Sequence, residues 1–148
     1  MKPPRMHWVI LTLIVVAYVA LAAQYARLTP PWQTPDEPAH FNYVKHVAEQ
    51  GRLPVLQEGD FPADYLEEIK RYHFPADMSI DPIRYESWQP PLYYVVAAGP
   101  YRLGMALGWS QGQLMLALRL LSVLFGAALL VVAYRAISLL APEQPWLA

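Results

Sequence analysis

Cysteine is absent from the 148 residues of this chain, which excludes a disulfide framework, a thiolate zinc site and a cysteine nucleophile. Charge is also scarce, because 16% of the residues are charged and the formal net charge is -1. No cluster of Lys and Arg stands beside an aromatic platform, so we expect no nucleic-acid partner. Any metal would need His and carboxylate ligands. We expect neither a metal nor a cofactor.

Apolar residues are abundant, at 55% of the chain, and they are gathered into runs. Runs that are apolar on all sides suit lipid better than water. Residues 8–26 would span about 28 Å as a helix, close to the ~30 Å of a bilayer core. Lys2 and Arg5 precede this run and are expected to hold the N-terminus in the cytoplasm. A cleaved signal peptide is the alternative, but the run continues to Tyr25, which favours an uncleaved anchor.

Two further apolar segments complete a predicted all-α fold with three transmembrane helices. The first of them, residues 91–109, is interrupted by Pro100 and by Arg102, so we expect a kinked span with Arg102 at the cytoplasmic interface. The second contains an uninterrupted apolar stretch at residues 120–134, and a short turn joins the two. The predicted division is therefore 1–27 (cytoplasmic N-terminus and first span), 28–90 (external loop) and 91–148 (two spans and an external C-terminus).

The predicted loop carries almost all of the acidic residues. Residues 28–89 contain eleven Asp and Glu against five Lys and Arg, which is compatible with an external position. The sequence Thr34-Pro35-Asp36-Glu37 forms a capping-box pattern and predicts a helix from Pro35 to about Gly51. A second amphipathic helix is predicted at residues 64–72, whereas residues 74–89 give no periodic signal. Both helices have the character of helices that lie along a membrane interface.

Two motifs of this loop resemble a known enzyme family. Residues 35–41 (Pro-Asp-Glu-Pro-Ala-His-Phe) follow the first span, and residues 88–94 (Trp-Gln-Pro-Pro-Leu-Tyr-Tyr) open the second. In this order they resemble the N-terminal part of the polyprenyl-phosphate-sugar-dependent glycosyltransferases of the GT-C class, such as protein O-mannosyltransferases and the lipid A aminoarabinose transferase. The resemblance covers about two-thirds of the chain. It implies transfer of a sugar from a polyprenyl-phosphate carrier to an acceptor hydroxyl on the external face of the plasma membrane.

The resemblance also implies roles for individual residues. Asp36 corresponds to the proposed catalytic base of the family, and Glu37 to its acidic neighbour. Gln89 stands where a histidine is common, and because an amide does not titrate, hydrogen bonding to a sugar or phosphate oxygen is the role left to it. Without the second motif, the two acids would be read as ordinary residues of a first helical turn.

Three more side chains are candidates for substrate binding. On the predicted helix, His40 and Tyr43 fall on the same stripe as Asp36. A carboxylate–histidine metal site is geometrically open there, but a hydrogen-bonding histidine at the edge of a cavity is the preferred interpretation. Arg84 could contact a lipid phosphate, although a solvated loop charge is the default for such a residue.

The length of the chain sets the main alternative. Full members of the family run to several hundred residues with many more spans, so the chain resembles an N-terminal fragment that would be inactive alone. A non-catalytic small membrane protein, an interaction or assembly subunit whose acidic loop binds a partner, is the second hypothesis.

Overall fold

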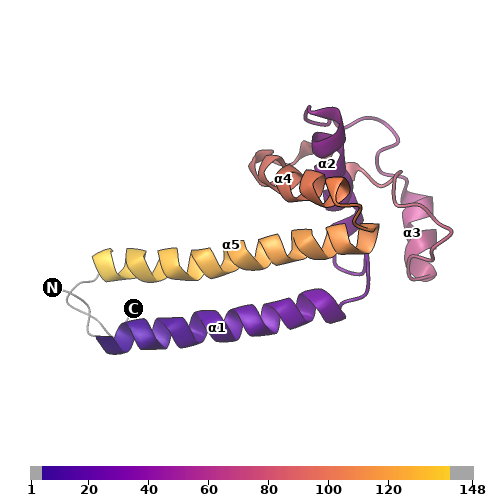
Figure 1. The fold of residues 1–148 in the computed structure, drawn as a ribbon. Coiled ribbons are helices and arrows are strands. Elements are labelled where there is room, and N and C mark those ends of the chain that lie inside the picture. Colours follow the sequence, from indigo (N-terminus) through magenta and orange to yellow (C-terminus); the bar gives the residue numbers. More distant parts are fainter. Residues whose placement is uncertain (1–4, 141–148) are drawn as a thin grey trace. The chain divides into compact units, whose positions relative to one another are not determined.

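A computed structural model describes residues 5–140, and within them the chain is all-helical, with five α-helices and no strand. The described residues form two compact units, one made of 5–28 with 119–140 and the other of 29–118. We describe each unit by itself (Figure 1). The elements in chain order are α1 (Arg5–Leu28), α2 (Glu37–Gln50), α3 (Ala63–Arg71), the 3₁₀-helix η1 (Tyr85–Trp88), α4 (Leu92–Ala106) and α5 (Gln111–Leu140).

Two of these helices have the length and composition of membrane spans. They are Met6–Leu28, with a mean hydropathy of 2.2, and Gln111–Leu140, with a mean hydropathy of 2.4. Their large apolar side chains are widely exposed, which in water would be an unfavourable surface. Examples are Leu13, Ile14, Leu21, Leu124, Leu129 and Leu139.

In the first unit, α1 and the C-terminal part of α5 contact each other in an antiparallel arrangement. The Trp8 ring packs edge-on against Tyr134 at 5.4 Å, near the start of α1 and the end of α5. At the opposite end, Arg119 Nη1 donates to Ala26 O at 2.9 Å. Between these contacts Tyr18 lies so close to Gly126 that a Cβ there would collide with the tyrosine hydroxyl. A small residue at such a point lets two apolar helices approach.

The second predicted span is shorter than expected. Helix α4 has 15 residues, or about 22 Å, whereas the core of a bilayer is ~30 Å thick. Pro100 lies inside α4 without ending it. Within residues 5–140, the helices long and apolar enough to cross a membrane are therefore two, not the three that the sequence predicted.

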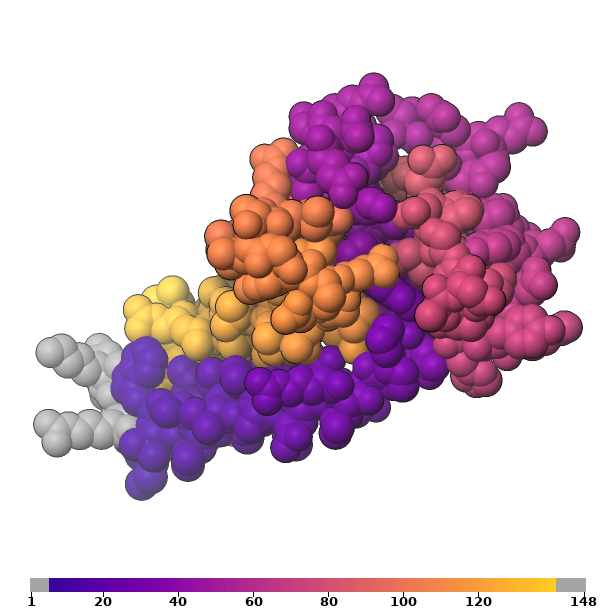
Figure 2. All heavy atoms as spheres, turned by 45° about the vertical axis from the view of Figure 1, so that its right-hand side comes forward, coloured from indigo at the N-terminus to yellow at the C-terminus, as the bar shows by residue number. Residues whose placement is uncertain are grey.

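Helices α2 and α4 run parallel and form the centre of the second unit. Near their N-terminal ends His40 contacts Tyr94, and near their C-terminal ends the Tyr101 hydroxyl donates to Glu49 Oε1 at 3.2 Å. Phe41 also packs edge-on against Tyr101 at 5.7 Å. Phe41 and Val44 lie on the buried face of α2. Part of the α4 surface, in salmon to orange, is visible in Figure 2, and its exposed residues include Leu92, Val95, Val96 and Leu103.

Arg102 occupies a different place from the one the sequence predicted. Its Nε donates to Ala48 O at 2.7 Å and its Nη2 to Val47 O at 3.2 Å. The last carbonyls of a helix have no partner within the helix, and they attract a cation. Arg102 therefore caps the C-terminus of α2 and is not the interfacial residue of a span that we expected.

The start of α2 also corrects the sequence analysis. The helix begins at Glu37, and Asp36 is its N-cap, in a left-handed conformation with φ 59°. No side chain caps this end, so the predicted capping box of Thr34 and Glu37 is wrong. In a helix that began at Pro35, the ring of Pro38 would collide with the carbonyl of Thr34, four residues earlier. In the observed helix Pro38 is at position N2, where its missing N–H costs no hydrogen bond within the helix. The predicted end is confirmed, because Gly51 follows the helix with φ 66°.

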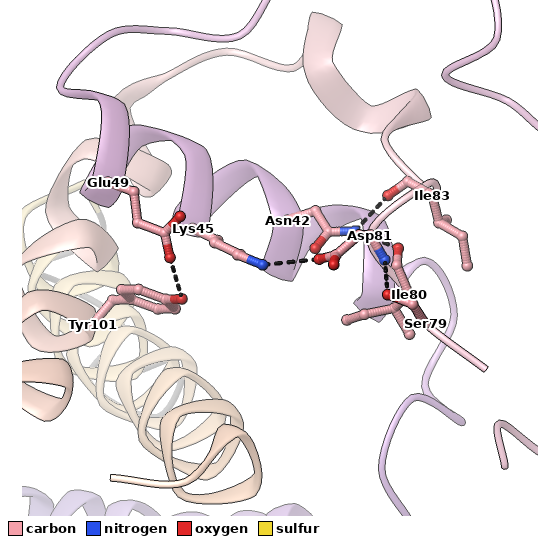
Figure 3. Close-up of polar contacts among 8 residues, drawn as sticks. All are labelled: Asn42, Lys45, Glu49, Ser79, Ile80, Asp81, Ile83 and Tyr101. Carbon is pink, nitrogen blue, oxygen red and sulfur yellow. Dashed lines mark hydrogen bonds and ion pairs between the residues drawn. The ribbon is translucent and has the colours of Figure 1, made fainter. Parts of the chain in front are cut away.

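The rest of the second unit is short helices and irregular chain. The predicted second amphipathic helix is confirmed as α3, whose Leu66 and Ile69 are buried. Residues 74–89 are irregular as predicted except for η1, but they are packed, since Ile80 and Ile83 are buried. Asn42 of α2 holds this segment by donating through Nδ2 to the carbonyls of both isoleucines, at 2.6 and 2.9 Å (Figure 3).

Candidate functional site

The two motifs of the resemblance contact each other in the second unit. The Tyr85 hydroxyl of η1 donates to Asp36 Oδ1 at 2.7 Å. The Tyr43 hydroxyl of α2 donates to the backbone carbonyl of Gln89 at 3.2 Å, and His40 Nδ1 lies 2.7 Å from the hydroxyl of Tyr94. Residues more than forty positions apart are thereby joined into one polar cluster. We call this set, Asp36, His40, Tyr43, Tyr85, Glu86, Gln89 and Tyr94, the motif cluster.

Asp36 is exposed and carries a carboxylate that is partly engaged. Its left-handed backbone conformation is one that Asp tolerates better than most residues, and it turns the chain into α2. Oδ1 accepts the bond from Tyr85, while Oδ2 has no hydrogen bond within the described residues. Burial, and then the bond to Asp36, raise the pKa of Tyr85, so that its phenol stays protonated and continues to donate. The second oxygen is left to accept a proton from another molecule.

Glu37 has a role in the backbone of the preceding turn. Its Oε2 accepts a hydrogen bond from the backbone N–H of Trp32 at 2.9 Å. Trp32 is buried, has φ 66° and packs edge-on against Phe41 at 5.1 Å. Glu37 thus stabilises the turn that leads into Asp36.

His40, Tyr43 and Tyr94 form an aromatic stack. The rings of Tyr43 and Tyr94 are parallel, with centroids 3.6 Å apart, and His40 stacks on Tyr94 at 6.0 Å. Burial raises the pKa of Tyr43, so that its phenol remains a donor at neutral pH. The prediction that His40 and Tyr43 share a face of α2 is correct, because both contact the same tyrosine.

Gln89 contacts an acidic residue that the sequence analysis did not single out. Its Nε2 donates to Glu86 Oε2 at 2.7 Å, and the exposed fraction of Glu86 is only 8%. A buried carboxylate needs such a donor. Glu86 and Tyr85 were missed as site residues because the segment before α4 has no periodicity, and Tyr94 was missed because it was assigned to a membrane span. Nothing in the sequence marked Glu86 as different from the other loop acids.

Arg84 is not part of the motif cluster. Its Nη2 forms an ion pair with Asp60 Oδ1 at 3.0 Å, and its backbone N–H donates to Asp60 O. Arg84 and Tyr43 both line an open cavity of about 250 Å³, whose lining does not include Asp36, Glu37, His40 or Gln89. The predicted substrate-binding residues are therefore divided between the motif cluster and this cavity.

The described residues contain no group of three or more His, Asp or Glu side chains placed to hold a metal ion. The comparisons add no relative: no protein-family model matches the chain, and neither the curated proteins nor the solved structures give a match. The function must therefore be argued from the residues themselves.

Proposed function

We propose that this chain forms the N-terminal part of a membrane glycosyltransferase, which moves a sugar from a polyprenyl-phosphate carrier to an acceptor hydroxyl. In this proposal, the part faces both the sugar donor and the acceptor. The observation that supports this most is the contact between the two motifs, in which His40 of the first lies 2.7 Å from the hydroxyl of Tyr94 of the second. Two neighbouring bonds, from Tyr85 to Asp36 and from Tyr43 to Gln89, attach each motif to residues beside the other. Each motif alone would be a weak signal, and their meeting in space is what a shared site requires.

Asp36 is the proposed base. Its Oδ2 would take the proton of the acceptor hydroxyl as that oxygen attacks the anomeric carbon, and the sugar–phosphate bond breaks with its electron pair leaving on the phosphate. A phosphate of low basicity needs positive charge or hydrogen bonds and no protonating carboxyl, which distinguishes this transfer from glycoside hydrolysis. Tyr85 would hold the carboxylate in place through its bond to Oδ1.

The other members of the site divide into two roles. His40 is partly exposed beside Tyr94 and is the proposed contact for a substrate hydroxyl. Glu37 and Gln89 are engaged with Trp32 and Glu86, so their proposed role is to position the turn and the start of α4.

The proposed membrane topology has two spans, α1 and α5. Their antiparallel contacts support a topology in which the first residues of α1 and the last residues of α5 lie on the same side of the bilayer. The basic start of the chain favours the cytoplasm as that side. Helix α4 packs along α2, which carries Glu37, Lys45 and Glu49. Charged residues are expensive inside a bilayer, so α4 belongs with the external part of the chain.

The experiment is a single substitution, Asp36→Asn, in the complete membrane protein. The amide keeps the bond from Tyr85 but cannot accept a proton, so transfer from a polyprenyl-phosphate sugar should fall by about a hundredfold or more, in membranes with unchanged protein content. Asp77→Asn, at an exposed loop acid, is the matched control and should leave transfer unchanged. Undiminished transfer by the Asp36 variant would overturn the proposal.

The second candidate is an assembly subunit that binds a basic partner. It is favoured by exposed acids on the surface of the second unit: Glu58, Asp64, Glu67, Glu68 and Asp77. The same assay separates the two candidates. For a subunit, the native protein shows no transfer, and replacing these exposed acids with amides releases the partner while Asp36→Asn does not.

A further inference from the structure

The cavity beside α2 has a distinct chemistry. It opens at the surface of the second unit and has a volume of about 250 Å³. Its polar lining residues include Asn42, His46, Arg52, Asp60, Arg84 and Ser87. Three of these residues follow the end of α2 or lie in the irregular chain, so only the tertiary fold brings them together.

Two arginines, Arg52 and Arg84, and one acidic residue, Asp60, line this cavity. Asp60 is buried, with its side chain 5% exposed, and its ion pair with Arg84 at 3.0 Å fixes the position of that guanidinium. Arg52 is exposed and has no hydrogen bond or ion pair within residues 5–140. With His46 neutral, the wall therefore carries one positive charge in excess, and its Arg52 donors are unused.

His46 lines the same cavity as Arg52 and Arg84. Burial lowers the pKa of His46, and the positive charges of Arg52 and Arg84 lower it further against the opposing effect of Glu49. This agrees with the positions of both arginines beside His46 in the lining of the cavity. The His46 Nε2 atom is buried without a hydrogen-bond partner in the described part of the chain.

Asn42 adds a second buried polar atom. Its Nδ2 donates to the carbonyls of Ile80 and Ile83, which fixes the amide orientation and makes Oδ1 the remaining acceptor. Oδ1 has no partner in the described residues. An unpaired buried acceptor is unfavourable, and it would be satisfied by a donor, such as a water bound beside the anion or a hydroxyl of its attached group.

We propose that this cavity is a binding site for a small phosphate-type oxyanion, held by Arg52 and Arg84. A guanidinium group presents paired N–H donors that match the oxygens of a phosphate, and the ion pair with Asp60 holds one of the two guanidinium groups ready before binding. The volume suits a phosphate with a small attached group. The site does not rest on the proposed transferase activity, because Asp36 takes no part in it.

The test uses the full chain in a neutral detergent, titrated with inorganic phosphate at constant ionic strength. The readout is the NMR signal of the His46 ring, assigned with His46→Gln. We expect saturable binding and an upward shift of the His46 pKa, because the bound anion offsets the charges of Arg52 and Arg84. Arg52→Gln should weaken binding by about tenfold. Arg71→Gln, at an exposed arginine at the end of α3 that does not line the cavity, should leave it unchanged.

A second pair of conditions identifies the source of the phosphate. If phosphatidic acid in phosphatidylcholine nanodiscs competes with inorganic phosphate, the ligand is a lipid headgroup. If pure phosphatidylcholine and the mixture give the same titration, the ligand is a free anion. Equal binding by the native chain and Arg52→Gln, or equal weakening by Arg71→Gln, would overturn the site.

Discussion

At the scale of single residues, Asn42 connects a regular helix to an irregular segment. Its exposed fraction is 5%, and its side-chain amide donates to two carbonyls about forty positions further along the chain. The segment that it holds includes Ile83, which is fully buried. Figure 3 shows this arrangement beside the surface ion pair of Lys45 with Asp81 at 2.8 Å. The Tyr65 hydroxyl of α3 also donates to Ser79 O at 2.7 Å, so the segment is attached at several points.

We expect Asn42→Ala to destabilise the second unit by about 2 to 4 kcal/mol, because two buried carbonyls lose their donors. Unfolding followed by the near-ultraviolet circular dichroism of the aromatic residues measures this. Asn42→Asp has almost the same volume but no N–H, so it should be at least as damaging. Gln50→Ala, at an exposed position of α2, is the control. Native stability of the Asn42→Asp variant would show that the two bonds contribute little.

At the scale of elements, the parallel packing of α2 on α4 organises the candidate site. The two helices are joined by a connection of about forty residues, which gives the chain room to return and run in the same direction. Arg102 and Tyr101 of α4 contact the end of α2, and the Tyr101 hydroxyl donates to Glu49 Oε1 at 3.2 Å. At the other end Tyr94 meets His40 and Tyr43. The position of α4 therefore determines where the residues of the motif cluster lie.

Loss of the Arg102 contact should loosen the last turn of α2. Arg102→Met keeps much of the apolar stem but removes the donors to the carbonyls of Val47 and Ala48, at a cost of about 1 kcal/mol for an exposed side chain. Hydrogen exchange should become faster at Gly51, whose N–H donates to Val47 O. Arg71→Met, away from α2, serves as the comparison. Unchanged exchange at Gly51 would mean that the helix end is stable without its cap.

At the scale of the whole molecule, the number of membrane crossings decides on which side each part lies. The structure gives two helices of sufficient length, and their contacts make them antiparallel. The turn between α4 and α5, with Gly108 at φ 71°, would then be external. With three crossings the same turn would be cytoplasmic.

Cysteine labelling distinguishes these topologies, because the chain has no cysteine of its own. Ser110→Cys, in the turn before α5, should react with an impermeant thiol reagent in intact cells if there are two spans. Ser79→Cys, which is external in either topology, is the control for labelling. Reaction of the Ser110 variant only after lysis, with Ser79 labelled in intact cells, would support three spans and contradict our proposal.

The sequence by itself determined the approximate position of the main helices and some of the chemically notable residues. Long apolar runs gave α1 and α5, Gly51 gave the end of α2, and the amphipathic period gave α3, because these signals act over a few neighbouring residues. The tertiary structure alone decided what those helices meet. Only packing showed that α4 lies along α2, that Arg102 caps a helix, that Arg84 pairs with Asp60, and that Glu86 is buried beside Gln89. Such contacts join residues far apart in the chain, and their energy depends on the burial and partners that each side chain acquires on folding.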